Sequence, residues 1–126
     1  MRYRYNTEYD PPAPFVDVNF ITAKSGRRVG PLSAFIDSGA DGTIVPVRYL
    51  EQIKAPKTDR AFIRSQWGDR YVVTMYQVDV QIDVLTLRGI EVVGDAISDE
   101  IILGRDVLNK LRVLLDGVAQ TTDVRS

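Results

Sequence analysis

The chain has 126 residues, of which 44% are hydrophobic, and its 16 basic and 17 acidic side chains leave a formal net charge of −1. This length suits one domain with a modest core, and the balanced charge lacks the basic excess that is typical of nucleic-acid-binding proteins. Cysteine and histidine are both absent, which excludes disulfides, cysteine-based zinc sites and histidine-dependent catalytic triads, so any acid–base chemistry would rest on carboxylates, lysine or tyrosine.

The N-terminal segment is predicted to be an extended, proline-rich arm over residues 1–14. Its end, Asp10-Pro11-Pro12-Ala13-Pro14, holds prolines that can neither donate to a strand ladder nor enter a helix. The alternating arginines and tyrosines at the start favour a solvated or docking terminus over a nucleic-acid contact. We see neither the apolar segment of a signal peptide nor a run near the roughly 20 residues of a membrane span, so we expect a cytoplasmic protein without a membrane partner.

The next elements are strands that lead into a loop of small residues. Residues 15–23 alternate between apolar and polar side chains, which predicts a half-buried strand, and residues 29–36 form a second one. The second strand delivers the chain to Asp37. Beyond that loop, residues 47–53 could form a short helix between Pro46 and Pro56.

A hairpin is predicted over residues 61–76. Trp67 and Gly68 lie at its tip, where the tryptophan is either exposed for contact or folded back onto the core. Residues 78–84 then alternate strictly, which predicts a strand whose acidic residues Asp79 and Asp83 face water.

The C-terminal part adds a strand at 85–93 broken at Gly89, a short buried run at 101–104, a short helix at 105–111 and a closing strand at 112–117. The last residues, 118–126, are expected to be a flexible tail because they hold little to bury. The sum is an all-β domain over residues 15–117, mainly β with one or two short helices, in a closed or sandwich-like arrangement.

Three kinds of site are considered for the loop that begins at Asp37, and the sequence excludes two of them. A calcium loop needs an oxygen ligand at its third position and a glutamate at its twelfth, but those places hold Gly39 and Arg48. A phosphate-binding loop needs a lysine, and here there is none. We therefore expect no metal and no cofactor.

The third kind is carboxylate catalysis. Two carboxyl groups a few ångströms apart share one proton, so one can activate water while the other hydrogen-bonds a peptide carbonyl. The sequence Asp37-Ser38-Gly39 has no second copy in the chain. One chain would thus supply half a site, and a homodimer with a two-fold axis would supply the rest.

These residues resemble the retropepsin-like aspartic proteases, the single-domain dimeric branch that includes retroviral proteases. The run Phe35-Ile36-Asp37-Ser38-Gly39-Ala40-Asp41 is similar to the first signature of the family, with serine where most members have threonine. The run Ile101-Ile102-Leu103-Gly104-Arg105-Asp106-Val107-Leu108 is similar to the second. The predicted hairpin stands between them, where the family has its flap, so the resemblance implies a closed, barrel-like acid-protease fold.

The resemblance also implies roles for single residues. Asp37 and its symmetry mate would form the dyad, Ser38 would hydrogen-bond across the axis, and Gly39 would let the substrate backbone pass. Five residues would bind an extended peptide: Ala40, Asp41, Trp67, Gly68 and Ile102. Three would support the structure or the dimer: Thr43, Gly104 and Arg105. Asp106, where many retroviral members carry asparagine, is interpreted as neutral.

The implied function is an aspartic endopeptidase that works as a homodimer on peptides or proteins with apolar residues at the scissile bond. The alternative is a catalytically silent dimerisation or peptide-binding module of the same fold. Besides Asp106, two features depart from retroviral members. The flap has Gly68 as its single glycine, and the arm at 1–14 differs from their interleaved termini, so an interface of different construction is expected.

Overall fold

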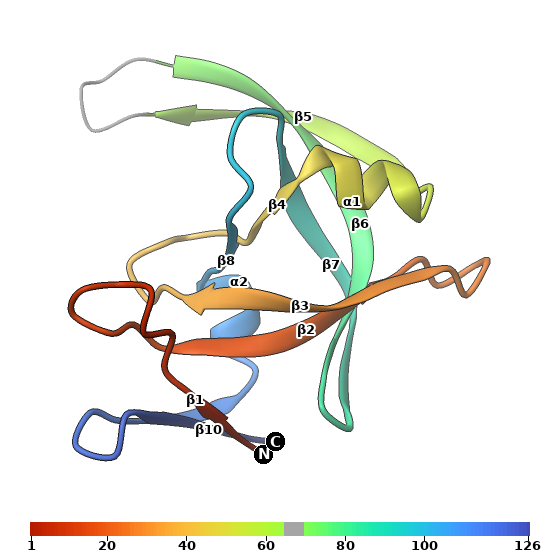
Figure 1. The fold of residues 1–126 in the computed structure, drawn as a ribbon. Coiled ribbons are helices and arrows are strands. Elements are labelled where there is room, and N and C mark those ends of the chain that lie inside the picture. Colours follow the sequence, from red (N-terminus) through yellow and green to blue (C-terminus); the bar gives the residue numbers. More distant parts are fainter. Residues whose placement is uncertain (65–69) are drawn as a thin grey trace.

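Six strands close a barrel in the computed structural model, which describes residues 1–64 and 70–126 (Figure 1). In spatial order they are β2 (Phe15–Ile21), β3 (Arg28–Ile36), β8 (Ile101–Leu103), β4 (Ile44–Pro46), β7 (Leu85–Asp95) and β6 (Arg70–Ile82). A pairing of β2 with β6 closes the ring. The β3–β8 and β4–β7 pairs are parallel and the other neighbours are antiparallel. The predicted all-β, closed-barrel fold is confirmed.

The predicted hairpin is present and is longer than expected. Strand β5 (Lys57–Arg64) pairs with β6 outside the closed ring, and β6 runs without interruption to Ile82. The second strand of the hairpin and the strand expected at 78–84 are therefore one continuous strand, β6. Trp67 and Gly68, expected at the tip, lie outside the described residues.

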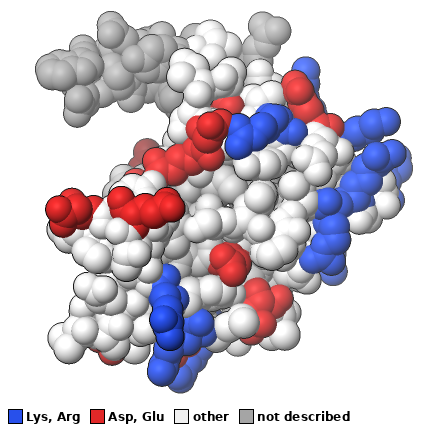
Figure 2. All heavy atoms as spheres, in the orientation of Figure 1, with Lys and Arg blue, Asp and Glu red and all other residues white. Residues whose placement is uncertain are grey.

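The hydrophobic core fills the interior of the barrel, and each of the six barrel strands contributes buried side chains to it. Val16, Val18 and Phe20 of β2 are buried while Asp17 is exposed, as the alternation predicts. The helices α1 (Val47–Gln52) and α2 (Arg105–Leu108) each contribute a fully buried side chain, Leu50 and Val107. Helix α2 ends earlier than the sequence predicts. Basic and acidic side chains are both exposed on the face drawn in Figure 2, the basic ones mostly at its right, as the balanced composition predicts.

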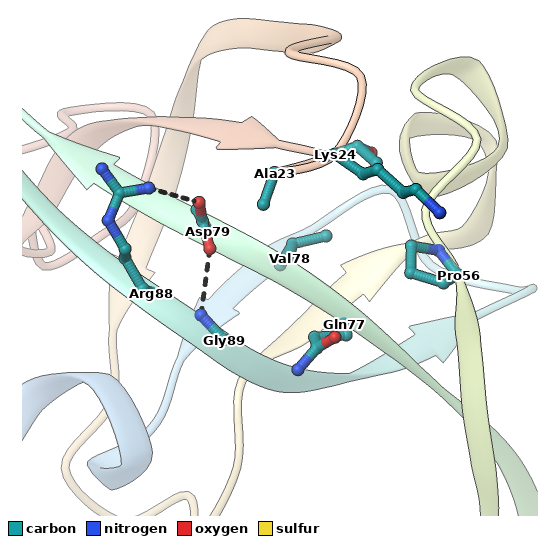
Figure 3. Close-up of a pocket in the computed structure, with 9 residues that line it drawn as sticks. Ala23, Lys24, Pro56, Gln77, Val78, Asp79, Arg88 and Gly89 are labelled. Carbon is teal, nitrogen blue, oxygen red and sulfur yellow. Dashed lines mark hydrogen bonds and ion pairs between the residues drawn. The ribbon is translucent and has the colours of Figure 1, made fainter.

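The prediction that Asp79 faces water is wrong. Its side chain is buried and accepts hydrogen bonds from the Gly89 backbone N–H at 3.0 Å and from Arg88 Nη1 at 3.1 Å (Figure 3). Strand β7 does not break at Gly89, which has a φ of +66° at a register shift between β6 and β7. A β-bulge at this point sets two residues of β7 against Asp79, and strict alternation cannot reveal such an extra residue.

A second sheet of three strands joins the two ends of the chain. Strand β10 (Thr121–Arg125) lies between β1 (Arg2–Arg4) and β9 (Arg112–Asp116), and all its pairs are antiparallel. The two termini of the chain lie side by side (Figure 1). This differs from the flexible tail expected at 118–126. Its two inward residues, Thr122 and Val124, are buried, and Val124 belongs to the main hydrophobic cluster. A strand with so few apolar residues gives no alternation signal.

The N-terminal arm folds back on itself. Asn6 and Ala13 exchange two backbone hydrogen bonds of 2.8 and 3.1 Å. Between them, the ring of Tyr9 packs against Phe15 and Phe35, with centroids 5.2 and 6.4 Å apart. The arm is therefore a loop that covers the end of β3 as well as a strand of the terminal sheet.

Substitution of Thr122 by valine should stabilise the fold. The side chain is fully buried, and its hydroxyl has no hydrogen-bond partner among the described residues. Removing an unsatisfied buried hydroxyl while keeping the shape should raise the free energy of unfolding by about 1 kcal/mol in urea denaturation. The matched control is Thr86→Val on β7, an exposed site where the change should stay within about 0.5 kcal/mol. A loss of stability in Thr122→Val would contradict the packing of β10.

Candidate active site

Asp37 stands where β3 leaves the barrel. Its backbone N–H donates to the Leu103 carbonyl of neighbouring β8 at 3.1 Å, which extends the parallel pairing by one residue. The side chain is half-buried, and its Oδ1 accepts from the Gly39 N–H at 2.9 Å. A Cβ at Gly39 would lie 3.2 Å from that oxygen. A small residue at 39 therefore leaves room around the carboxylate.

The backbone of Gly104 packs against the far side of the same loop. A Cβ at this position would lie 2.5 Å from both the carbonyl carbon and the oxygen of Gly42. The next residue, Arg105, donates its backbone N–H to the Ala40 carbonyl at 2.9 Å. The two stretches that resemble the family signatures are thus in direct contact, although they are far apart in the sequence.

The guanidinium of Arg105 braces the loop from outside. Nη1 donates to the Ser38 carbonyl at 2.8 Å, and Nη2 binds the Asp41 carboxylate. The two side chains are 43% and 93% exposed, so the ion pair itself contributes little to stability. Its effect is to hold Ser38 and Asp41 in one arrangement, with Ser38 and Gly39 open to solvent.

Beneath the loop lies a partly buried polar network centred on Asp106. The hydroxyl of Thr43, which is fully buried, donates to Asp106 Oδ1 at 2.7 Å and accepts from the Gly104 N–H at 3.1 Å. The Thr43 N–H donates to Asp106 Oδ2 at 3.1 Å, and the Val107 N–H to Oδ1 at 2.8 Å. A satisfied network of this kind rigidifies the loops that it joins.

Asp106 is the residue that sequence reasoning undervalued when it was interpreted as neutral. Its carboxylate ties the loop after Asp37 to the start of α2. A signal was available, because an acidic residue in the first turn of a helix binds the free N–H groups there. The partner Thr43 could not be read from the sequence, since the contact depends on the barrel topology.

An apolar hollow of about 580 Å³ lies beside strand β6 of the hairpin, with further walls from β4, from the end of β7 and from the loop after it. Ile44 of β4, Val72 of β6 and Ile97 of the loop after β7 contribute to its wall. Ile102 was expected to line an apolar pocket. It lies on β8, where it pairs with Ile44 of β4. Of these two residues, Ile44 lines the hollow among the described residues and Ile102 does not.

The predicted site residues therefore fall into three groups. The structure brings together one cluster around the loop: Asp37, Ser38, Gly39, Ala40, Asp41, Thr43, Gly104 and Arg105. Ile102 lies beside it on β8. Trp67 and Gly68 are outside residues 1–64 and 70–126. Within those ranges no helix is both long and apolar enough to cross a bilayer, and no three acidic side chains gather as a metal site.

Comparisons with known proteins point to one group. Residues 26–110 match the family model described as "gag-polyprotein putative aspartyl protease". No curated protein matches the chain. Among solved structures, the chain is similar to the EIAV protease in complex with the inhibitor HBY-793, with 20% identity, a TM-score of 0.59 and coverage of 86% of this chain and 93% of that one.

Two further structures share this fold. The simian foamy virus (mac) protease is 22% identical, with a TM-score of 0.54 and coverage of 75% of this chain and 91% of that one. A retropepsin-like aspartic protease from Rickettsia conorii is 12% identical, with a TM-score of 0.65 and coverage of 99% and 88%. Identities this low show the shared fold, and the match to the family model covers the loop of Asp37 together with the Gly104-Arg105 turn.

Proposed function

Because the chain belongs to the gag-polyprotein aspartyl protease family, we propose that it is an aspartic endopeptidase that is active as a homodimer. The observation that carries this proposal is the carboxylate of Asp37, which stands at the end of β3 and accepts a hydrogen bond from the Gly39 N–H, while the Asp37 backbone is hydrogen-bonded to β8. The motif Asp-Ser-Gly occurs once in the sequence. The second carboxylate would therefore come from the same loop of a second copy, related by a two-fold axis.

The chemistry follows from two carboxyl groups that share one proton. The ionised carboxylate takes a proton from water as the water oxygen attacks the peptide carbonyl carbon. The protonated carboxyl donates its hydrogen to the carbonyl oxygen, which gives a tetrahedral diol. Proton transfer to the amide nitrogen then lets the carbon–nitrogen bond break, and the products are a carboxylic acid and an amine. The dyad ends with one shared proton, as it began.

The surroundings of the loop suit an extended peptide. The β5–β6 hairpin stands on one side of the apolar hollow that Ile44 and Val72 help to line. Closure of a hairpin over bound substrate excludes water and aligns the scissile bond. Exposed Gly39 and Asp41 would bind the substrate main chain, and Arg105 would position Asp41. The apolar wall favours substrates with apolar side chains near the scissile bond.

Binding of a statine-type transition-state mimic tests the proposal. We expect the mimic to stop cleavage of extended peptides at mildly acidic pH and to bind at one molecule per two chains, because a single dyad serves the dimer. Calorimetric titration measures the stoichiometry. Stoichiometry of one mimic per chain would exclude the shared dyad, and binding of peptides without turnover anywhere between about pH 3 and 7 would contradict catalysis.

A further inference from the structure

Strand β9 forms an open edge of the terminal sheet. In the order β1-β10-β9, one side of β9 pairs with β10, and within the described residues its other side pairs with no strand. Such an edge presents a row of free N–H and C=O groups that can pair with another strand. Natural proteins usually protect open edges with charges or by covering them.

The middle of this edge is apolar. Leu114 is 62% exposed and Leu115 49% exposed, although both are large hydrophobic residues. Being adjacent in a strand, they point to opposite faces of the sheet. The charged residues Arg112 and Asp116 stand at the two ends of the strand and leave its centre unprotected.

The sequence of β9 is complementary to itself. If two copies pair antiparallel about Leu114, Arg112 of one copy faces the partner's Asp116, and Asp116 faces the partner's Arg112. Leu114 then faces its own symmetry mate. Directly opposed residues of opposite charge, and directly opposed apolar residues, stabilise antiparallel pairs. An isologous two-fold contact needs this kind of self-complementary surface.

The other edge of the same sheet lacks this property. Strand β1 has Arg2 and Arg4 on either side of Tyr3. Pairing of two copies about Tyr3 would place Arg2 opposite the partner's Arg4 at both ends, and like charges directly opposite are destabilising. Of the two edges, β9 is therefore the one that favours a second copy of the chain.

We propose that β9 pairs with β9 of a second copy about a two-fold axis at Leu114, which joins the two terminal sheets into one sheet. This inference rests on the proposed function, which requires a second copy of the Asp37 loop. Strand β9 follows α2 directly, and Arg105 at the start of α2 binds Ser38 and Asp41. The same short stretch of chain therefore braces the site and supplies the contact. Because β1 pairs with β10 of its own chain, no terminal strand is exchanged between copies.

Charge reversals at the two ends of β9 test the pairing. In Arg112→Asp homodimers both pairs become acid opposite acid, and in Asp116→Arg homodimers both become base opposite base. We expect the dimer dissociation constant of each variant, measured by sedimentation equilibrium at low salt, to rise at least about 10-fold. In an equimolar mixture of the two variants, each pair is again acid opposite base, so dimers should return to within about 3-fold of wild type.

A double variant provides the matched control. Asp116 Oδ1 accepts from the Ala119 N–H at 3.0 Å, so Asp116→Arg also removes a contact of the β9–β10 turn. The chain with both Arg112→Asp and Asp116→Arg loses the same contact, yet it is self-complementary again. It should dimerise about as tightly as wild type. Failure of this variant to dimerise, while it keeps the melting temperature of Asp116→Arg, would overturn the proposed register.

The outcomes separate this proposal from the proposed function. If both single variants dimerise like wild type and still cleave peptide, the β9 pairing is wrong and the protease stands. If the mixture regains dimers but neither it nor wild type cleaves peptide, the pairing stands and the protease fails. Sedimentation measures the dimer dissociation constant, which does not depend on whether the protein cleaves peptide.

Discussion

Replacement of Asp37 by asparagine should lower peptide cleavage at least about a thousandfold while the protein stays folded and dimeric. The amide keeps a carbonyl oxygen that can accept the Gly39 N–H, as Oδ1 does at 2.9 Å in the native loop. The loop should therefore keep its shape, and the loss isolates the chemistry. Peptide hydrolysis at mildly acidic pH measures the effect, with sedimentation and melting as checks on assembly and folding.

A mixing experiment sharpens this expectation. Addition of an equal amount of Asp37→Asn to wild type should reduce cleavage by about half, because random exchange leaves only half of the wild-type chains with a wild-type partner. Unchanged cleavage after exchange would mean that each chain acts alone. Asp83→Asn is the control, since Asp83 is exposed at the β6–β7 turn with a φ of +55° that asparagine also tolerates. This variant should leave cleavage unchanged.

Replacement of Gly104 by alanine should lower the free energy of unfolding by about 3 kcal/mol or more. The new Cβ would lie 2.5 Å from the Gly42 backbone and 3.0 Å from the Ala40 carbonyl oxygen. Backbone atoms cannot rotate away as a side chain does, so the Asp37 loop itself has to shift. Cleavage should fall with stability. Urea denaturation and peptide hydrolysis measure the two effects.

The same contact offers its own control. A Cβ at Gly42 meets no atom within 4 Å, and the backbone there is outside the left-handed region. Gly42→Ala should therefore leave stability unchanged or raise it by about 1 kcal/mol, through the lower entropy of the unfolded chain. Equal urea midpoints for the two variants would show that the close packing of Gly104 on the loop is not what holds the site.

The sequence was sufficient for the elements that bury a regular apolar face. Val16, Val18 and Phe20 mark β2 because alternation reports which side of a strand is buried. The loop of Asp37 and the turn at Gly104 were recognisable from residue types alone. Their contact was not, because it depends on the parallel pairing of β3 with β8.

The features that were missed share a physical cause. Asp79 is buried because a bulge sets two residues of β7 against it. The alternation of apolar and polar residues in β6 cannot reveal an extra residue in the neighbouring strand. Strand β10 was hidden because its inward positions are Thr122 and Val124, too few for a pattern. Asp106 was undervalued because its partner, Thr43, is distant in the sequence and comes beside it only through the pairing of β4 with β8.

The pairing of β1 with β10 has a consequence for how the chain folds. The two strands stand at opposite ends of the sequence, so their ladder closes a loop that spans nearly the whole chain. Loop closure of this length opposes folding entropically, and contacts between distant residues slow it. During synthesis β1 has no strand to pair with until β10 has been made. The sheet that carries β9 is therefore complete only after β10 has been made, which is later than every strand of the barrel.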